Sequence, residues 1–131
     1  MPLSQNLQNY LNSINSKTDF YIVTTFYKFL ELKYYKEFKI TFDNFLIKTD
    51  IKGTILLAKE GINGTISSSK HDLKRFFLFL EKFKEFNEIC PKYSCADKNP
   101  FLRMKVRLKK EIVTIGIPEV NTSENVGEYL D

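Results

Sequence analysis

Basic and apolar residues alternate between Arg103 and Lys110, in the order Arg-Met-Lys-Val-Arg-Leu-Lys-Lys. This two-residue period sends side chains to opposite faces of a β-strand, so the segment predicts one apolar face and one cationic face. No acidic residue interrupts the basic side before Glu111. A row of cations suits phosphate groups and indicates a polyanionic partner. The expected cationic stripe consists of Arg103, Lys105, Arg107 and Lys109.

The stripe also has a purely structural interpretation. Charged side chains on an exposed edge strand discourage pairing with another chain. Both interpretations agree with the sequence taken alone. The adjacent pair Lys109 and Lys110 breaks the alternation, which predicts a bulge or bend at that point.

Three other groups of residues have the types of side chain or backbone that chemistry could use. The segment Gly61-Ile-Asn63-Gly64 could direct backbone N–H groups at an anion, but a turn between two strands that needs glycine is the simpler interpretation. Cys90 and Cys95 have neither a recurrent redox spacing nor a glycine-rich loop beside them, so we expect free loop thiols. His71 is expected to face solvent. We therefore assign no catalytic residue and no metal ligand.

Composition limits the class of protein. The 131 residues suit one domain, and 43% hydrophobic residues are enough for a core. Two cysteines and one histidine are too few for a disulfide scaffold or a four-ligand zinc site. We expect no membrane span, no signal peptide and a cytoplasmic location. The net charge of +4 is moderate, so only the distribution of charge is informative.

The hydrophobic pattern predicts three helices. An amphipathic helix is expected after Ser4, a second from Tyr35, and a third after Ser69, which lies three residues before Asp72 as in a variant of the capping box. Strands are expected at Phe20 to Phe29, buried on both faces, at Thr54 to Ala58, at Thr65 to Ser67, and from Phe101 to about Ile115; residues 87–100 are expected to be a loop.

This order of elements predicts an α+β fold, the ferredoxin-like βαββαβ sandwich. We expect a four-stranded antiparallel sheet with two helices on one face and an extra N-terminal helix. The basic strand, as the last of the four, is expected at an edge of the sheet beside the first strand.

Two stretches resemble a known family, namely GTILLAKEGINGTI from Gly53 to Ile66 and PFLRMKVRLKKEIVTIG from Pro100 to Gly116. They are similar to the N-terminal acylphosphatase-like domain of the rhodanese-related tRNA uridine hydroxylases, in which a rhodanese domain follows. Lys92 and Ser94 match a Lys-x-Ser element of that family. The resemblance covers the chain from about Phe20 to its end.

The resemblance implies an oxygen-dependent 5-hydroxylation of the wobble uridine of tRNA, with the catalytic cysteine in the rhodanese domain and no cofactor in this domain. Implied partners are the anticodon arm of tRNA and a rhodanese domain in cis or in trans. We expect residues 1–18 to be an N-terminal amphipathic segment, residues 19–117 the acylphosphatase-like domain, and residues 118–131 a linker toward a rhodanese domain that this chain lacks.

The resemblance also indicates candidate site residues. RNA-binding candidates are Arg103, Lys105, Arg107, Lys109, Lys110 and Lys92. A loop that could line the active site of the complete enzyme contains Glu60, Gly61, Asn63 and Gly64.

Two alternatives stay open, and two others are disfavoured. The domain could be a stand-alone RNA-binding or protein-interaction module without catalysis, and part of the stripe could dock a rhodanese domain. A generic RNA-recognition motif is disfavoured because its third-strand signature is absent from Gly64 to Ser69. Acylphosphatase activity would need an arginine in the loop after the first strand, and residues 28–36 contain none.

Overall fold

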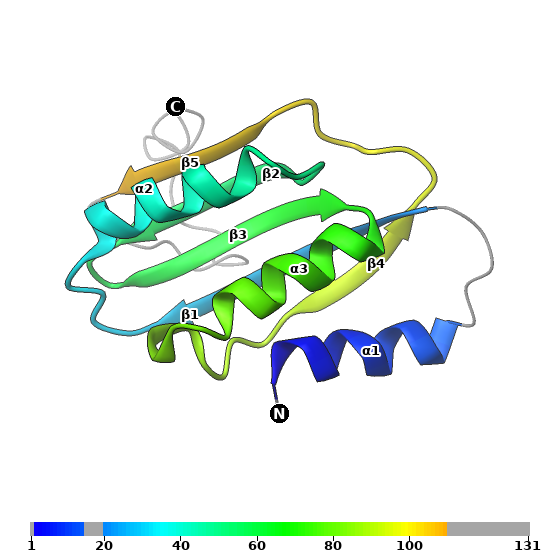
Figure 1. Cartoon of the computed structure of the whole chain (residues 1–131), viewed down its shortest axis with the longest axis horizontal. Helices are drawn as coiled ribbons and strands as arrows, with labels where there is room; N and C mark the ends of the chain where they lie inside the picture. Colours follow the sequence, from blue (N-terminus) through cyan, green and yellow to red (C-terminus); the bar gives the residue numbers. More distant parts are fainter. Residues whose placement is uncertain (1, 15–19, 110–131) are drawn as a thin grey trace, which may run out of the picture.

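The computed structural model of the chain describes residues 2–14 and 20–109. Five strands form one sheet in the order β4-β1-β3-β2-β5, and the helices α2 and α3 cover one of its faces (Figure 1). In chain order the elements are α1 (Leu3–Ile14), β1 (Tyr21–Phe29), α2 (Tyr35–Leu46), β2 (Lys52–Ala58), β3 (Gly61–Ser68), α3 (Lys70–Leu80), the 3₁₀ helix η1 (Lys84–Phe86), β4 (Lys92–Ala96) and β5 (Met104–Lys109).

The ferredoxin-like fold is confirmed, but the basic strand has a different place in it. The unit β1-α2-β2-β3-α3-β4 is the βαββαβ sandwich, with β4 antiparallel to β1. The predicted loop 87–100 therefore contains the fourth strand. The basic strand β5 is a fifth strand, parallel to β2 at the other edge. The sheet is mixed, and the expectation that the basic strand lies beside the first strand was wrong.

The physical reason for this error is the brevity of β4. Its five residues follow Pro91, and only Tyr93 and Cys95 point to the helix-covered face, so it has no clear apolar periodicity. The strand β1 also differs from expectation. Its burial alternates, with Ile22 and Phe26 buried and their neighbours in the strand only partly covered, so one face of β1 is buried and not both.

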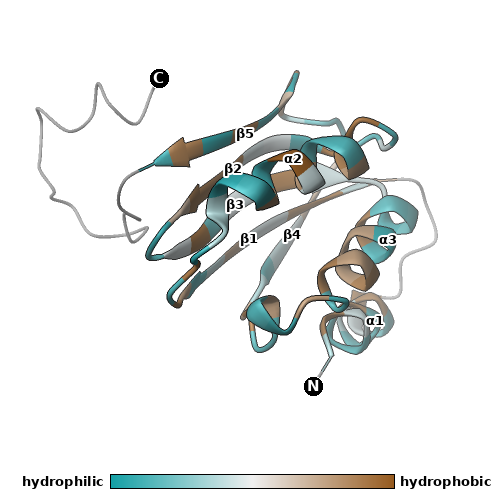
Figure 2. Ribbon diagram, turned by 60° about the vertical axis from the view of Figure 1, so that its left-hand side comes forward, coloured by the Kyte–Doolittle hydropathy of each residue, from teal (hydrophilic) through white to brown (hydrophobic). Residues whose placement is uncertain are grey.

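Aromatic rings fill the space between the sheet and the two helices. Phe42 of α2 lies edge-to-face with Phe76 of α3 at 6.0 Å between ring centroids, and Phe86 of η1 approaches Phe42 at 5.5 Å. Figure 2 shows that the ribbons of α2 and α3 each contain hydrophobic segments. On the sheet side, the ring of Phe26 lies over Gly64, where an added Cβ would come within 2.8 Å of Phe26 Cζ.

The first helix packs outside this core layer, against α3 and β4. It begins at Leu3 and not after Ser4, and both Leu3 and Leu7 are buried. Tyr10 stacks on Tyr93 of β4 at 4.6 Å between centroids, and the Tyr93 hydroxyl donates a 2.5 Å hydrogen bond to Asn6 Oδ1. Burial, with a smaller contribution from the Cys95 thiol 3.2 Å away, raises the pKa of Tyr10 to about 12.

The predicted capping of α3 is confirmed, with an additional partner. Ser69 Oγ accepts a hydrogen bond from Asp72 N at 3.2 Å, and the Ser69 N–H is donated to the side chain of Asp50. Asp72 in turn accepts the Asp50 N–H at 2.8 Å and one from Arg75. Burial raises the pKa of Asp72, but hydrogen bonds from Asp50, Arg75 and His71 outweigh this effect and hold the pKa below its usual value.

Candidate nucleic-acid interface

The face of the sheet opposite α2 and α3 is called here the open face. Residues that pair across neighbouring strands point to the same side, so the register identifies which side chains belong to it. Five of them are basic, and no Asp or Glu occupies an open-face position of the five strands. The basic side chains are Lys92 of β4, Lys52 of β2, and Lys105, Arg107 and Lys109 of β5.

One row of the open face joins the two edges of the sheet. Lys92 pairs with Thr25, and the register continues through Thr65 and Thr54 to Lys105. The two lysines are exposed, and the three threonines are partly exposed. With strands about 4.8 Å apart, the row spans about 19 Å. A lysine thus lies at each end of a row of three threonine hydroxyl groups. These hydroxyl groups can donate hydrogen bonds to phosphate or sugar oxygens.

The next row carries an aromatic side chain. Tyr27 of β1 pairs with Asn63, and the register leads through Leu56 to Arg107. Tyr27 is 42% exposed and Arg107 is partly exposed, whereas Asn63 between them is 6% exposed and therefore covered.

Three of the cations at the edges are not neutralised by carboxylates of the described residues. Within residues 2–14 and 20–109, no Asp or Glu side chain lies within ion-pair distance of Lys92, Lys105 or Arg107. Ion pairs are instead found in the helices, for example between Lys39 and Asp43 of α2 at 2.6 Å. Lys92, Lys105 and Arg107 therefore keep their charge available for an external anion.

The predicted site residues fall into three places. Lys105, Arg107 and Lys109 share the open face as expected, and Lys92 joins them from the opposite edge. Arg103 precedes β5 and is exposed, and its carbonyl accepts the Gly53 N–H at 2.7 Å. Lys110, together with the predicted bulge, lies outside the described residues. The apolar side of the stripe behaves as predicted at Val106, which is buried.

The sequence analysis missed Lys52, Tyr27 and Phe29 as members of this surface. Phe29 is 51% exposed and lies two residues from Tyr27 on the same side of β1. Because both faces of β1 were expected to be buried, Tyr27 and Phe29 were not expected to be exposed. The signal that could have found them is the alternation of β1 itself, in which Ile22, Thr24 and Phe26 form one face.

The glycine-containing segment does not form the turn it was expected to form. The turn between β2 and β3 consists of Lys59 and Glu60, whose carbonyls accept the N–H groups of Leu32 and Leu30. Gly61 begins β3 with φ +145°, and an added Cβ would meet the Lys28 carbonyl at 2.2 Å, so close packing against β1 requires glycine there.

The remaining two members of that segment, Asn63 and Gly64, lie inside β3 on opposite sides of the sheet. Asn63 and Gly61 are on the open face, in the rows of Arg107 and Lys109, while Gly64 is under Phe26 on the helix-covered face. The backbone of this segment pairs with β1 and β2 on both sides. Its N–H groups are used in the sheet and do not converge on an anion.

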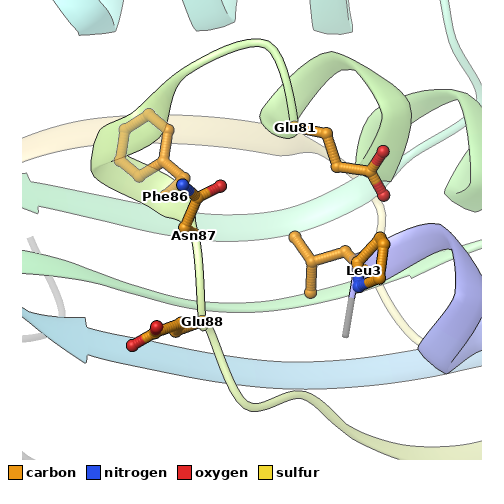
Figure 3. Close-up of a pocket in the computed structure, with 6 residues that line it drawn as sticks. Leu3, Glu81, Phe86, Asn87 and Glu88 are labelled. Atoms are coloured by element: carbon orange, nitrogen blue, oxygen red, sulfur yellow. The ribbon is translucent and has the colours of Figure 1, made fainter.

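A pocket at the start of α1 has the opposite electrostatic character. It lies between α1 and η1 and is lined by Leu3, Phe86, Asn87 and the acidic residues Glu81 and Glu88 (Figure 3). The Glu81 side chain accepts the Ser4 N–H at 2.6 Å. Two carboxylates do not suit a phosphate group, so this pocket is not part of the candidate interface.

Two further groups of residues add no other chemistry in the described part of the chain. Cys90 and Cys95 are free and exposed, with Cys95 in β4 and not in a loop, and His71 is exposed at the start of α3. Residues 2–14 and 20–109 contain no group of three His, Cys, Asp or Glu side chains that could hold a metal ion. None of their helices is long and apolar enough to cross a bilayer.

Residues 21–112, from β1 through β5, match the family model described as UPF0176 acylphosphatase like domain. The chain belongs to this family. Among curated proteins, the acylphosphatase-like domain is similar to relatives named tRNA uridine(34) hydroxylase. It is 44% identical over 110 residues to the relative from Acaryochloris marina and 45% identical over 109 residues to that from Bartonella quintana.

The acylphosphatase-like domain corresponds to only part of these relatives. The two alignments cover 84% and 83% of this chain but 36% of each relative. A third relative, from Ehrlichia ruminantium, is 40% identical over 111 residues, which are 85% of this chain and 40% of the relative. The chain thus spans about two fifths of the length of the curated relatives it matches, and each relative contains further chain.

Proposed function

We propose that this acylphosphatase-like domain recognises tRNA for an oxygen-dependent hydroxylase that modifies the wobble uridine at its 5-position. The open face is the surface that contacts the RNA. The observation that carries the proposal is the register of the sheet, which gathers Lys92, Lys105 and Arg107 on one side, where the five described strands place no acidic residue. The names of the relatives support tRNA as the polyanion.

The distribution of charge over the domain supports this proposal, and the total charge does not. The whole chain has a formal net charge of +4, yet the open-face positions of the five described strands carry five basic side chains and no acidic one. Acidic residues are instead found at the helices and turns, as with Glu60, Glu81 and Glu88. A phosphate backbone is therefore attracted to one side of the domain.

In this proposal the chemical step belongs to a rhodanese domain, present in cis or in trans. That domain supplies the catalytic cysteine, and molecular oxygen is the co-substrate. The role of the acylphosphatase-like domain is to hold the anticodon arm in a fixed orientation, because positioning by itself lowers the entropic barrier of a reaction between two large molecules. We place this activity in the cytoplasm.

The test is a titration of labelled tRNA with the chain at several salt concentrations. We compare the chain with Arg107→Glu and Lys105→Glu, and with Lys74→Glu as the matched control, since Lys74 is an exposed lysine on the outer side of α3. Each lost phosphate contact reduces the slope of log affinity against log salt by about 0.7 to 0.9. We expect Arg107→Glu and Lys105→Glu to bind tRNA more weakly and with a weaker dependence on salt. Lys74→Glu should bind tRNA as the unchanged chain does.

Two outcomes separate RNA binding from the structural interpretation of the stripe. If all three variants lose the same small amount of affinity, the open face has no special role and the proposal is wrong. If the β5 variants bind tRNA normally but aggregate more readily than the control, the stripe protects the sheet edge instead.

A further inference from the structure

We infer that Tyr27 and Phe29 form a platform on which an unpaired base of the bound RNA stacks. This inference rests on the proposed function, because it specifies that the RNA bound by the open face has an unpaired base. It begins from the exposure of two large aromatic side chains in β1. Tyr27 and Phe29 pair with β3, lie beyond the residues 21–25 that pair with β4, and are 42% and 51% exposed.

The two rings form one surface. Tyr27 and Phe29 are two residues apart in β1 and therefore point to the same side, and their centroids are 5.8 Å apart at an interplanar angle of 68°. This edge-to-face arrangement leaves the outer side of the rings available. Exposed aromatic rings on a sheet surface stack with the bases of single-stranded RNA, since every base has a π-face.

Charge complementarity favours a nucleotide as the occupant of this platform. Arg107 lies in the row of Tyr27 and Lys105 in the adjacent row, on β5. The distance from β1 to β5 corresponds to three strand spacings, about 14 Å. A nucleic-acid strand offers bases to the rings and phosphates to the cations, whereas an apolar protein surface satisfies only the rings.

The platform predicts a preference for single-stranded over double-stranded RNA. In a duplex the bases are stacked on one another and their faces are not accessible, so only the phosphate contacts would remain. An anticodon arm offers both features, because its loop exposes unpaired bases and its stem offers phosphates. Lys92 at the β4 edge and Lys105 at the β5 edge then contact the backbone on either side of the platform.

The experiment separates base contacts from phosphate contacts by using abasic RNA. A labelled single-stranded oligonucleotide is compared with one of equal length in which several nucleotides are abasic, so that the phosphate charges are unchanged. Binding is measured by anisotropy for the chain, for the double variant Tyr27→Leu/Phe29→Leu, and for Tyr34→Leu. Tyr34 is the matched control, because it is 54% exposed but lies just before α2.

We expect the chain to bind the intact strand at least about fivefold more tightly than the abasic strand, the lower end of the contribution of one stacked base. The Y27L/F29L variant should lose this preference, and Y34L should keep it. The variant K105E should weaken binding of both strands by the same factor. Far-UV circular dichroism checks that each variant retains its secondary structure.

The possible failures are distinguishable. If the chain binds both strands equally, or if Y27L/F29L keeps the preference, the stacking platform is wrong while phosphate recognition by the open face stands. If neither strand binds and tRNA does not bind either, the proposed function fails together with the inference. If Y27L/F29L leaves RNA binding intact but weakens association with a rhodanese domain, the two rings are a protein-docking surface and the inference is overturned.

Discussion

Lys92 and Lys105 lie in the same row of the open face, at opposite edges of the sheet, with Thr25, Thr65 and Thr54 between them. They belong to the last two strands of the described chain, but the sheet separates them by its full width. The separation is about 19 Å, beyond the Debye length of about 8 Å at physiological ionic strength. In the proposed complex with tRNA, the two lysines would therefore contact different phosphates.

The first prediction concerns the independence of these two lysines. Lys92→Gln and Lys105→Gln should each reduce the slope of log affinity for tRNA against log salt by about 0.7, and the double variant by about 1.4, because each removes one phosphate contact. The two effects should add because the lysines are too far apart to influence each other. The measurement is tRNA binding between low and physiological salt, with Lys74→Gln as control. A double variant no weaker than either single one would contradict the prediction.

The second prediction concerns the pH dependence of stability. Since the pKa of Asp72 is lower in the folded chain than in the unfolded chain, its carboxylate stabilises the fold above the unfolded value of about 3.9. This contribution is lost as the pH falls through the lower, folded-state pKa. Denaturant unfolding at several pH values should therefore show a decline of stability below about pH 4 that is smaller in Asp72→Asn.

At neutral pH the same substitution should lower the free energy of unfolding by about 1 to 3 kcal/mol. It removes the charge from hydrogen bonds with the Asp50 N–H and Arg75, in a side chain that is 12% exposed. Asp43→Asn is the control, because Asp43 makes only an exposed pair with Lys39 within α2, and it should cost less than about 0.5 kcal/mol. Equal losses in both variants would exclude a special role for Asp72.

The third prediction concerns the contact between Phe26 and Gly64. In Gly64→Ala the new Cβ would lie 2.8 Å from Phe26 Cζ and 3.1 Å from Ile55 Cγ1, so we expect a loss of about 1 to 3 kcal/mol. In the background Phe26→Leu the same alanine should cost less, because the obstructing ring is gone. Thermal or urea unfolding of the four chains tests this coupling, and purely additive losses would contradict it.

The fourth prediction concerns a buried hydroxyl. Thr24 lies on the helix-covered face of β1, is fully buried, and its Oγ1 has no hydrogen-bond partner among the described residues. Thr24→Val keeps the shape and removes the unpaired group, so the free energy of unfolding should rise by about 1 kcal/mol. Thr25→Val, on the partly exposed open face, should have little effect. A destabilised Thr24→Val would show that the hydroxyl is satisfied.

The sequence predicted the parts of this protein that depend on local periodicity. The apolar spacing of Phe38, Phe42 and Leu46 located α2, and the capping residues Ser69 and Asp72 located the start of α3. Strand β5 was found from its alternation. These features are encoded by neighbouring residues, because a helix or strand with one buried face repeats its apolar positions at a fixed interval.

The placement of strands relative to one another could not be predicted in the same way. The last strand was expected beside β1, but a short strand without apolar periodicity, β4, occupies that edge and β5 lies at the other. Strand pairing is a contact between distant parts of the chain, and its selection depends on the packing of the whole core. The same reason explains why the distance between Lys92 and Lys105 was not foreseen.

The amino-acid sequence alone determined which residues are basic, which strand carries most of them, and to which family the stretches around Gly53 and Pro100 are similar. Only the tertiary structure decided that Lys92, Lys105 and Arg107 share one face with Tyr27 and Phe29, and that this face carries no acid on its strands. The physical reason is the register. A shift of one residue in any strand pairing would turn that strand's side chains to the other side of the sheet.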